Sequence, residues 1–515
     1  MTYLVDGFFF VANFTKPKSL AEQLRIQQEK RREMDRALGV QATQKAELSP
    51  MAGKLRLGVK IKGDRFNNGN GVEENSGWLQ FDQSLLDQHM FVLGATGAGK
   101  SETLKRIIYE TLVSTDRDVF FIDGKGDASL ALGVRSLAHR YGRGVAPIFR
   151  LGFSQNGAVY NGFNGHATDV YNRLAALIGV REAEGNATFY ADLNRDILQL
   201  VCFAPVGCPR SFEEVRDRIS KEWLLTAYKD DPYEVEAIEG LSDRDIAGLA
   251  QRIRPLQRVF SKTVGPEGFS LEETRCAIFS MRTQSVGDTA ERFLEFLVED
   301  VKDFMGKRQR RPALLIVDEF GQFNNASIIA LLSLARSSQM GVVLATQDTS
   351  NLKDPENRRL VLANTRTKIL MATDFPEEVG TLAGTILQLE SSMQHMDGDT
   401  TGAGSSRIQH AFKIDMNEVA ALRAGEAFVI RQRRAGKVHI RRIGDVPLIE
   451  DQRPQIRELK RRKIEKQQQI EPSSIESELP TTKEKPESKR PPKNKETVIP
   501  KKKKKATKKP FGMKD

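Results

Sequence analysis

The chain has 515 residues, of which 39% are hydrophobic and 29% are charged. This length allows two or three domains, so the chain is not a single compact module. The composition is that of a soluble protein with a polar excess. The net charge is +11, and residues 455–515 account for all of it because they contain 20 Lys and Arg against 9 Asp and Glu. The basic charge therefore cannot by itself indicate that the folded core binds nucleic acid.

Cysteine usage and apolar runs indicate the compartment. The three cysteines, Cys202, Cys208 and Cys276, have no spacing typical of a metal site, which predicts a reducing compartment without disulfide bonds. The apolar run at residues 8–12 is shorter than the roughly seven residues of a signal-peptide core and the roughly 20 residues of a membrane span. We therefore expect a cytoplasmic protein that contacts membranes only through partners or charge.

Residues 1–50 form the first predicted segment. Residues 19–38 combine spaced apolar side chains with many Lys, Arg, Glu and Gln, a pattern typical of a weakly amphipathic, basic helix. Such a helix is either a solvated surface helix or a docking element for a partner or an anionic membrane surface. Residues 55–61 alternate as in a strand and residues 67–71 are typical of a turn, so a small β element is expected before the core.

A strand, a glycine-rich loop and a helix follow one another at residues 90–112. Residues 94–101 read G-x-x-x-x-G-K-S, and the glycines permit positive φ and a close approach of backbone N–H groups to a β-phosphate. Lys100 would reach the β and γ oxygens, and the Ser101 hydroxyl would bind Mg²⁺. The predicted ATP-binding residues are Gly94, Ala95, Thr96, Gly97, Ala98, Gly99, Lys100, Ser101 and Glu102.

Apolar strands and amphipathic helices alternate after this loop. Continuous apolar runs of this kind are typical of parallel strands that helices bury on both faces, and residues 289–304 have the matching helical pattern. The predicted fold is therefore α/β, a RecA-like P-loop NTPase with a mainly parallel central sheet. Its strands are expected at residues 118–122, 146–151, 277–281, 313–317, 341–345 and 368–372.

Residues 165–262 interrupt this alternation with helical patterns and no convincing strand, which predicts an inserted all-α domain. Its helices are expected at residues 170–178, 191–203, 212–229 and 243–260. The nucleotide-binding domain then comprises residues 51–164 and 263–450. It includes a Gly/Thr/Ser loop at 397–406 and a terminal strand pair at 426–431 and 437–442.

The C-terminal segment, residues 451–515, is dominated by Lys, Glu, Pro, Gln and Ser. Such a composition cannot bury enough apolar surface to fold, so we expect this segment to be disordered. The unbroken lysines at 501–505 are either an arm for phosphate backbones or a solubilising or partner-docking tail.

A second buried strand ends in the acidic pair Asp318 and Glu319. Side chains alternate along a strand, so the two carboxylates should point in different directions. We assign Asp318 to the Mg²⁺ shell and Glu319 to the general base that activates the attacking water.

Three further features lie near these motifs. Gln347 ends a buried strand, where its amide either senses the γ-phosphate or holds the water, or simply caps the strand. Arg336 precedes that strand. The sequence around it alone favours a solvated side chain over an arginine finger that acts on a neighbouring subunit's nucleotide. Residues 123–127 read D-G-K-G-D and predict a tight turn that is either near the nucleotide or purely structural.

Together these features resemble the FtsK–HerA superfamily of ring-forming DNA pumps, and most closely the TraD/TraG-like coupling proteins of conjugative type IV secretion systems. The resemblance covers about residues 78–445. It rests on an ordered series of motifs at residues 88–94, 123–127, 160–163, 318–320, 345–347, 364–368 and 425–428. Gly124 departs from the family, which has Pro at that place.

The resemblance implies a homo-hexameric ring with ATP at the subunit interfaces, helices over one mouth, and DNA bound without sequence preference in the central channel. Arg336 then becomes an arginine finger acting on the neighbouring subunit, and Gln347 becomes the γ-phosphate sensor. The implied activity is ATP hydrolysis that drives DNA, with its bound relaxase, into a conjugative secretion channel. The implied place is the bacterial cytoplasm.

Family members usually carry an N-terminal membrane anchor, and this sequence has no such segment. We therefore expect a soluble member that inner-membrane secretion components recruit, or a pump with another task. The alternatives are a receptor ATPase for protein substrates of a secretion system, and a HerA-like ATPase for DNA processing or packaging.

Overall fold

The computed structural model describes residues 52–448, except 62–76, 156, 181–186, 308–309, 324–325, 353, 397–398 and 445. The predicted N-terminal helix at 19–38, the turn at 67–71 and the C-terminal segment 451–515 lie outside the described residues. None of the described helices is both long enough and apolar enough to cross a bilayer.

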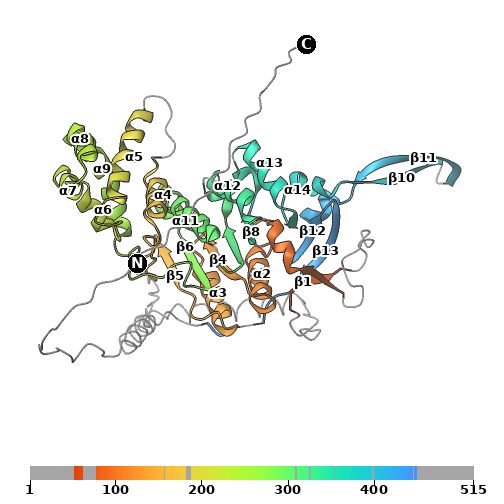
Figure 1. Ribbon diagram of the computed structural model, residues 1–515. Coiled ribbons are helices and arrows are strands. Elements are labelled where there is room, and N and C mark those ends of the chain that lie inside the picture. Colours follow the sequence, from red (N-terminus) through yellow and green to blue (C-terminus); the bar gives the residue numbers. More distant parts are fainter. Residues whose placement is uncertain are drawn as a thin grey trace, which may run out of the picture. The chain divides into compact units, whose positions relative to one another are not determined.

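An 11-stranded sheet forms the centre of the described chain (Figure 1). Its order is β2-β1-β13-β12-β9-β3-β8-β7-β4-β6-β5, and the run from β9 to β5 is parallel. The predicted α/β fold with a mainly parallel sheet is thereby confirmed. The parallel strands are β9 Thr367–Met371, β3 Met90–Leu93, β8 Met340–Thr346, β7 Ala313–Asp318, β4 Asp118–Asp123, β6 Cys276–Met281 and β5 Ile148–Leu151.

Four antiparallel strands extend one side of this sheet. They are β12 Glu426–Arg431, β13 Arg434–Ile440, β1 Lys54–Lys60 and β2 Trp78–Asp82. The strand predicted at 437–442 begins three residues earlier because Gln432 and Arg433 both have positive φ and close a two-residue hairpin turn.

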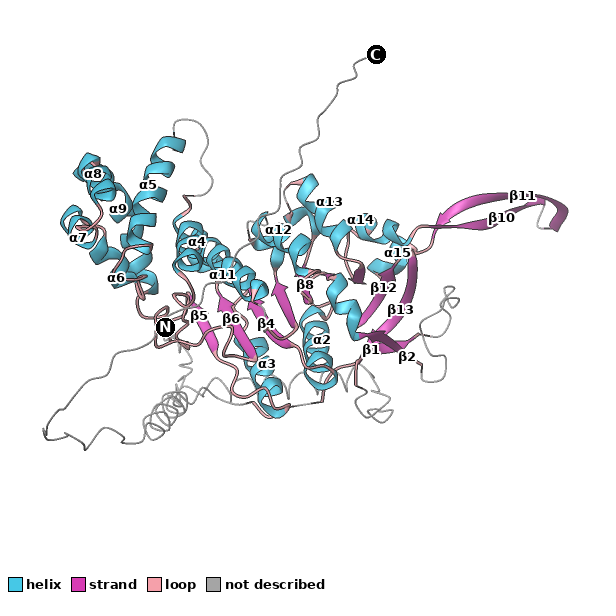
Figure 2. Cartoon of the chain, in the orientation of Figure 1, coloured by secondary structure: helices cyan, strands magenta, loops and turns pink. Residues whose placement is uncertain are grey.

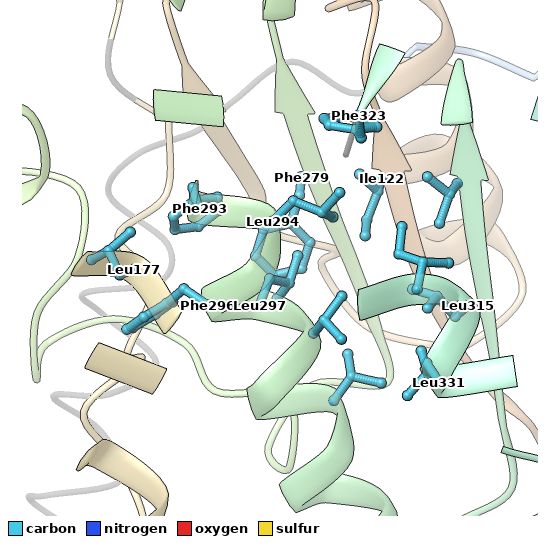
Figure 3. Close-up of a cluster of buried hydrophobic side chains, with 14 of the residues drawn as sticks. Ile122, Leu177, Phe279, Phe293, Leu294, Phe296, Leu297, Leu315, Phe323 and Leu331 are labelled. Atoms are coloured by element: carbon cyan, nitrogen blue, oxygen red, sulfur yellow. The ribbon is translucent and has the colours of Figure 1, made fainter. Parts of the chain in front are cut away.

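Helices cover both faces of the sheet, and consecutive strand residues alternate between two apolar cores. Phe120 belongs to one core and Phe121 to the other, as the period of two in a strand requires. On the Phe121 face lie α2 Lys100–Ser114 and α3 Ala128–Arg140. On the Phe120 face lie α11 Asp288–Gly306, α12 Ala326–Ala335 and α13 Pro355–Asn364, and Figure 3 shows the α11 side chains among those of the strands.

Between β5 and β6 the chain forms six described helices (Figure 1). They are α4 Ala167–Ile178, α5 Ala187–Cys202, α6 Phe212–Arg218, α7 Lys221–Ala227, α8 Pro232–Gly240 and α9 Asp243–Phe260. The single helix predicted at 212–229 is wrong, because Ser220 accepts a hydrogen bond from Trp223 N and starts α7. Asp231 and Pro232, an N-cap followed by proline at the first helical position, are the signal from which α8 could have been predicted. The proposed domain boundaries remain predictions.

Helix α4 is tied to α11 through a buried arginine. Arg173 is fully buried and forms ion pairs of 2.9 Å with both Asp300 and Asp303. Tyr160 donates a further hydrogen bond to Asp300. This network fixes the start of the helical segment to the core of the sheet.

A Gly/Thr/Ser loop was predicted at 397–406. This prediction is wrong for residues 399–406, the part that the structure describes, because they form a strand. β10 Thr385–Met396 pairs with β11 Asp399–Phe412 in a separate antiparallel hairpin (Figure 2). Backbone pairing with β10 satisfies the polar groups of residues that would otherwise favour a turn.

The remaining described elements are short. They are η1 Gln83–Gln88, α10 Thr283–Val286, η2 Phe320–Gln322, η3 Thr349–Asn351, α14 Glu377–Gly380, η4 Thr381–Ala383 and α15 Met416–Ala420.

Candidate active site

The loop at residues 94–99 connects the carboxyl end of β3 to α2. Gly97 and Gly99 have φ of 87° and 107°, which favours glycine over residues with a side chain. A Cβ at Gly94 would lie 2.8 Å from Met371 Cβ, so the close approach to β9 also requires glycine. The loop is held by hydrogen bonds from Gly94 N to Thr346 O and from Ala95 N to Ala372 O.

The N-terminus of α2 faces this loop. Gly99 is the N-cap residue and provides no side-chain hydrogen bond, so the first N–H groups of the helix remain available to an anion. Lys100 and Ser101 are the first two helical residues and line the same cavity as the loop. The arrangement is suited to a phosphate chain.

Lys100, Glu319, Gln347 and Thr96 form a continuous hydrogen-bonded chain at the end of the sheet. Lys100 Nζ donates to Glu319 Oε1 at 3.1 Å, and Gln347 Nε2 donates to the same oxygen at 2.7 Å. Thr96 Oγ1 donates to Gln347 Oε1 at 2.9 Å. Three elements distant in sequence thus meet within one polar cluster, and Gln347 contacts both the loop and the acidic pair.

Asp318 lies beside this hydrogen-bonded cluster and is also buried. Its carboxylate accepts a hydrogen bond from Glu319 N at 3.0 Å, and Glu319 has a φ of 54°, so the two carboxylates leave the strand in different directions. Burial raises the pKa of Asp318 to about 6, with Lys100 opposing the shift. Asp123 pairs with Asp318 across the sheet, and burial raises the pKa of Asp123 to about 7.

The turn at residues 123–127 is built around Asp123. Its Oδ1 accepts hydrogen bonds from Lys125 N and Gly126 N, and Oδ2 accepts one from Ser280. Asp127 then caps α3 by accepting from Ser129 N and Leu130 N. Lys125 and Asp127 line the same cavity as the phosphate loop, so the turn has a structural role and also borders the site.

The cavity above the loop has a volume of about 340 Å³. Besides the predicted loop residues, one face of α3 and the segment after β13 line it. These two walls were not predicted, because their aliphatic residues have no motif that separates them from ordinary core positions.

Arg336 lies away from this cluster. It is exposed, follows the end of α12, and precedes β8 at the strand's amino end. Gln347 follows the carboxyl end of the same seven-residue strand, about 20 Å away at roughly 3.3 Å per residue. The structure therefore does not bring Arg336 to the Glu319 of its own chain.

His89, which directly precedes β3, links helix α12 to strand β8. Its Nδ1 accepts from Val342 N at 3.2 Å, so Nε2 donates to Leu332 O at 3.0 Å. The imidazole is 2% exposed, and burial lowers its pKa below 6.5. The neutral ring thereby fixes α12 against β3 and β8.

Comparisons with known proteins agree with this geometry. Residues 312–424 match the family model of the TraM recognition site of TraD and TraG. No curated protein matches the chain in sequence. The unbound bacterial conjugative coupling protein TrwBdeltaN70 superposes with a TM-score of 0.55 at 18% identity, covering 78% of this chain and 98% of that one.

Two TrwB structures with bound nucleotides match this chain with TM-scores close to that of the unbound form. The complex with ADP and Mg²⁺ has a TM-score of 0.52 at 17% identity, covering 77% of this chain and 97% of that one. The complex with the non-hydrolysable ATP analogue ADPNP has a TM-score of 0.52 at 19% identity, covering 78% and 98%. The chain therefore shares the TrwB fold, and the predicted resemblance to TraD/TraG-like coupling proteins is confirmed.

Proposed function

We propose that the chain is an ATPase that acts as a coupling protein, driving DNA with its bound relaxase towards a conjugative type IV secretion channel. The observation that carries this proposal is the polar cluster of Lys100, Glu319 and Gln347 at the phosphate loop. Such a cluster provides a cation for the phosphates, a base for water and an amide that senses the γ-phosphate. The similarity to TrwB, which binds ADP with Mg²⁺ and ADPNP, supports ATP as the ligand.

The residues present fit Mg²⁺. The Ser101 hydroxyl and the Asp318 carboxylate line one cavity, and such hard oxygen donors suit an ion that takes its other ligands from water and phosphates. Among the described residues no group of three or more acidic, His or Cys side chains forms a metal centre. Bound Mg²⁺ would offset charge on the β and γ oxygens.

The chain's own residues then account for hydrolysis. A triphosphate at the loop would draw Lys100 Nζ from Glu319 to its β and γ oxygens, leaving Glu319 bonded to Gln347. Glu319 would accept a proton from the water that attacks the γ-phosphorus, while the bond to the β-phosphate oxygen breaks. Through its hydrogen bond with Thr96, Gln347 would couple the presence of the γ-phosphate to the position of the phosphate loop.

We further propose that Arg336 acts in trans within a homo-hexameric ring. Its position at the amino end of β8 leaves it free of its own chain's Glu319, which suits a residue that serves a neighbour. A guanidinium presented to the γ-phosphate of the next subunit would stabilise the charge of the transition state. Hydrolysis would then depend on the assembled ring.

The partners follow from the matched family. The model for residues 312–424 describes TraM recognition by TraD and TraG, which supports contacts of this segment with a relaxosome protein. The DNA would be bound without sequence preference in the channel of the ring, and inner-membrane secretion components would position the protein.

ATP turnover of the full chain, with and without DNA, tests this function. We expect turnover with Mg²⁺ to rise on adding single- or double-stranded DNA of unrelated sequences. Turnover unchanged by both forms of DNA would reject the translocase and favour a receptor ATPase for protein substrates.

A further inference from the structure

We propose that His89 is the positioning residue for Arg336, because its imidazole fixes the end of α12 from which Arg336 would reach the neighbouring subunit. The inference rests on the proposed action of Arg336 in trans and names the group of the donating chain on which that action depends. His89 directly precedes β3, whereas Arg336 directly follows α12. The link between them is a long-range contact that only the folded chain contains.

The backbone of His89 has an unfavourable conformation. Its φ is 55° and its ψ is 154°, a combination that residues with a side chain rarely adopt. Such strain persists only where the surrounding contacts hold the residue in place. Glycine would relieve the strain, so a histidine at this position indicates a use for its side chain.

Hydrogen bonds hold the main chain of His89 and of the residue before it. His89 N donates to Leu86 O at 3.1 Å, and Arg366 N donates to Gln88 O at 2.9 Å. Thr367 N, at the start of β9, donates to His89 O at 3.4 Å. These bonds hold the imidazole in a defined place at the amino end of β3.

The imidazole uses both of its nitrogens. Nδ1 of His89 accepts from Val342 N on β8 at 3.2 Å, and Nε2 donates to Leu332 O at 3.0 Å. Leu332 lies in the last turn of α12, where carbonyl groups have no partner within the helix. His89 is 2% exposed, so water does not compete with the imidazole for this carbonyl. The ring therefore joins the end of α12 to the sheet.

The segment that carries Arg336 is held on both sides. On the α12 side, His89 binds the carbonyl of Leu332, four residues before Arg336. On the β8 side, Gln339 O accepts from Arg117 Nη1 at 3.0 Å. Arg336 is exposed between these two anchors. Burial lowers the pKa of His89 and the charge of Arg336 lowers it further, so the guanidinium lies within electrostatic reach of the ring.

The two ends of β3 would thus serve two different ATP sites. Its carboxyl end continues into the phosphate loop of the chain's own site, whereas its amino end, through His89, holds the segment meant for the neighbour's site. Losing the bond to Leu332 O should release the end of α12 and misplace the guanidinium of Arg336. The contacts of the phosphate loop should remain.

Two substitutions separate the contacts of the ring. Asparagine is among the residues found most often at positive φ, and its Oδ1 can accept from Val342 N, but the side chain is too short to reach Leu332 O. The amide of glutamine is long enough to donate to Leu332 O. We expect His89→Asn to lower kcat by about tenfold or more, and His89→Gln to stay within about threefold of wild type. Both should bind ATP within about twofold of wild type.

Mixed rings distinguish this role from damage to the chain's own site. A His89→Asn chain should donate Arg336 poorly but should keep a working Glu319. Mixing it with Glu319→Gln protein, which offers a well-placed Arg336, should raise turnover above the mean of the two components. Mixing it with Arg336→Ala protein should leave turnover at that mean, because neither chain then offers a well-placed guanidinium.

The opposite pattern, a rise with Arg336→Ala and none with Glu319→Gln, would show that His89 supports its own chain's site and would overturn the inference. A rise with neither partner, wild-type turnover of His89→Asn, loss of its ATP binding, or a His89→Gln protein as impaired as His89→Asn would overturn it as well. An Arg336→Ala and Glu319→Gln mixture that stays inactive would instead reject the proposed action of Arg336 in trans.

Discussion

The amide of Gln347 donates to the same Glu319 oxygen that accepts from Lys100, at 2.7 Å from Gln347 and 3.1 Å from Lys100. The carboxylate of Glu319 is thus oriented by the end of β8 and by the first residue of α2. Any ligand that moves Lys100 leaves Gln347 as the remaining described side chain bonded to Glu319.

Gln347→Ala should therefore impair hydrolysis more than binding. Without the amide, Glu319 loses its orientation and Thr96 loses its acceptor, so we expect kcat to fall by about 10- to 100-fold while KM changes little. Steady-state turnover measures both constants. Gln199→Ala, an exposed change on α5, is the matched control, and a Gln347→Ala enzyme with normal kcat would contradict the role.

Arg336 and Glu319 should complement each other between subunits. Arg336→Ala and Glu319→Gln proteins should each be inactive alone, since one lacks the finger and the other the base. Mixing them creates interfaces with Arg336 from one subunit and Glu319 from the next, so turnover should reappear.

Turnover of the mixture at fixed total protein is the readout for this pair. Arg359→Ala, an exposed arginine on α13, should stay active alone and serves as the control. A mixture as inactive as its components would show that Arg336 does not act in trans.

The buried imidazole of His89 makes stability depend on pH. Burial lowers its pKa, while Asp87 raises it and Arg336 lowers it further, so below pH 6.5 the unfolded state binds more protons than the folded state. Stability contributed by neutral His89 is therefore full above pH 6.5 and is lost as pH falls through the lowered pKa.

His89→Gln should flatten this part of the stability curve, since glutamine does not titrate. Thermal unfolding between pH 5 and 8 measures the slope. Substitution of exposed His410 by Gln is the control, and a wild-type slope in His89→Gln would assign the pH dependence to other groups.

Arg173 should be a large determinant of stability. Arg173→Ala would leave the buried Asp300 and the partly buried Asp303 without their cation, which costs about 3–5 kcal/mol. Arg216→Ala, which breaks an exposed pair with Asp217, should change stability by less than about 0.5 kcal/mol. Denaturant unfolding compares the two, and equal effects would mean that the α4–α11 network is not needed for the fold.

Local signals made the centre of the fold predictable. The phosphate loop, the acidic pair and the parallel strands are each encoded within a few consecutive residues, and the structure places them where the sequence indicates. The hairpin β10–β11 was missed because glycine, serine and threonine in residues 399–406 favour turns until a partner strand pairs with them. The break at Ser220 was missed because a single capping serine interrupts an otherwise continuous helical pattern.

The relative placement of residues that are far apart in the sequence could not be predicted from it. Nothing local distinguishes Leu130 or Val446 from ordinary core residues, yet both line the cavity at the phosphate loop. The position of Arg336 at the far end of β8 from Gln347 also depends on the strand direction that only the sheet defines.

The most direct measurement is ATP binding and turnover by Glu319→Gln in the presence of Mg²⁺ and DNA. The substitution keeps the shape of the side chain and removes the base, so ATP should bind as in wild type while turnover falls by at least about 100-fold. A Glu319→Gln protein that binds ATP and hydrolyses it at the wild-type rate would contradict the account.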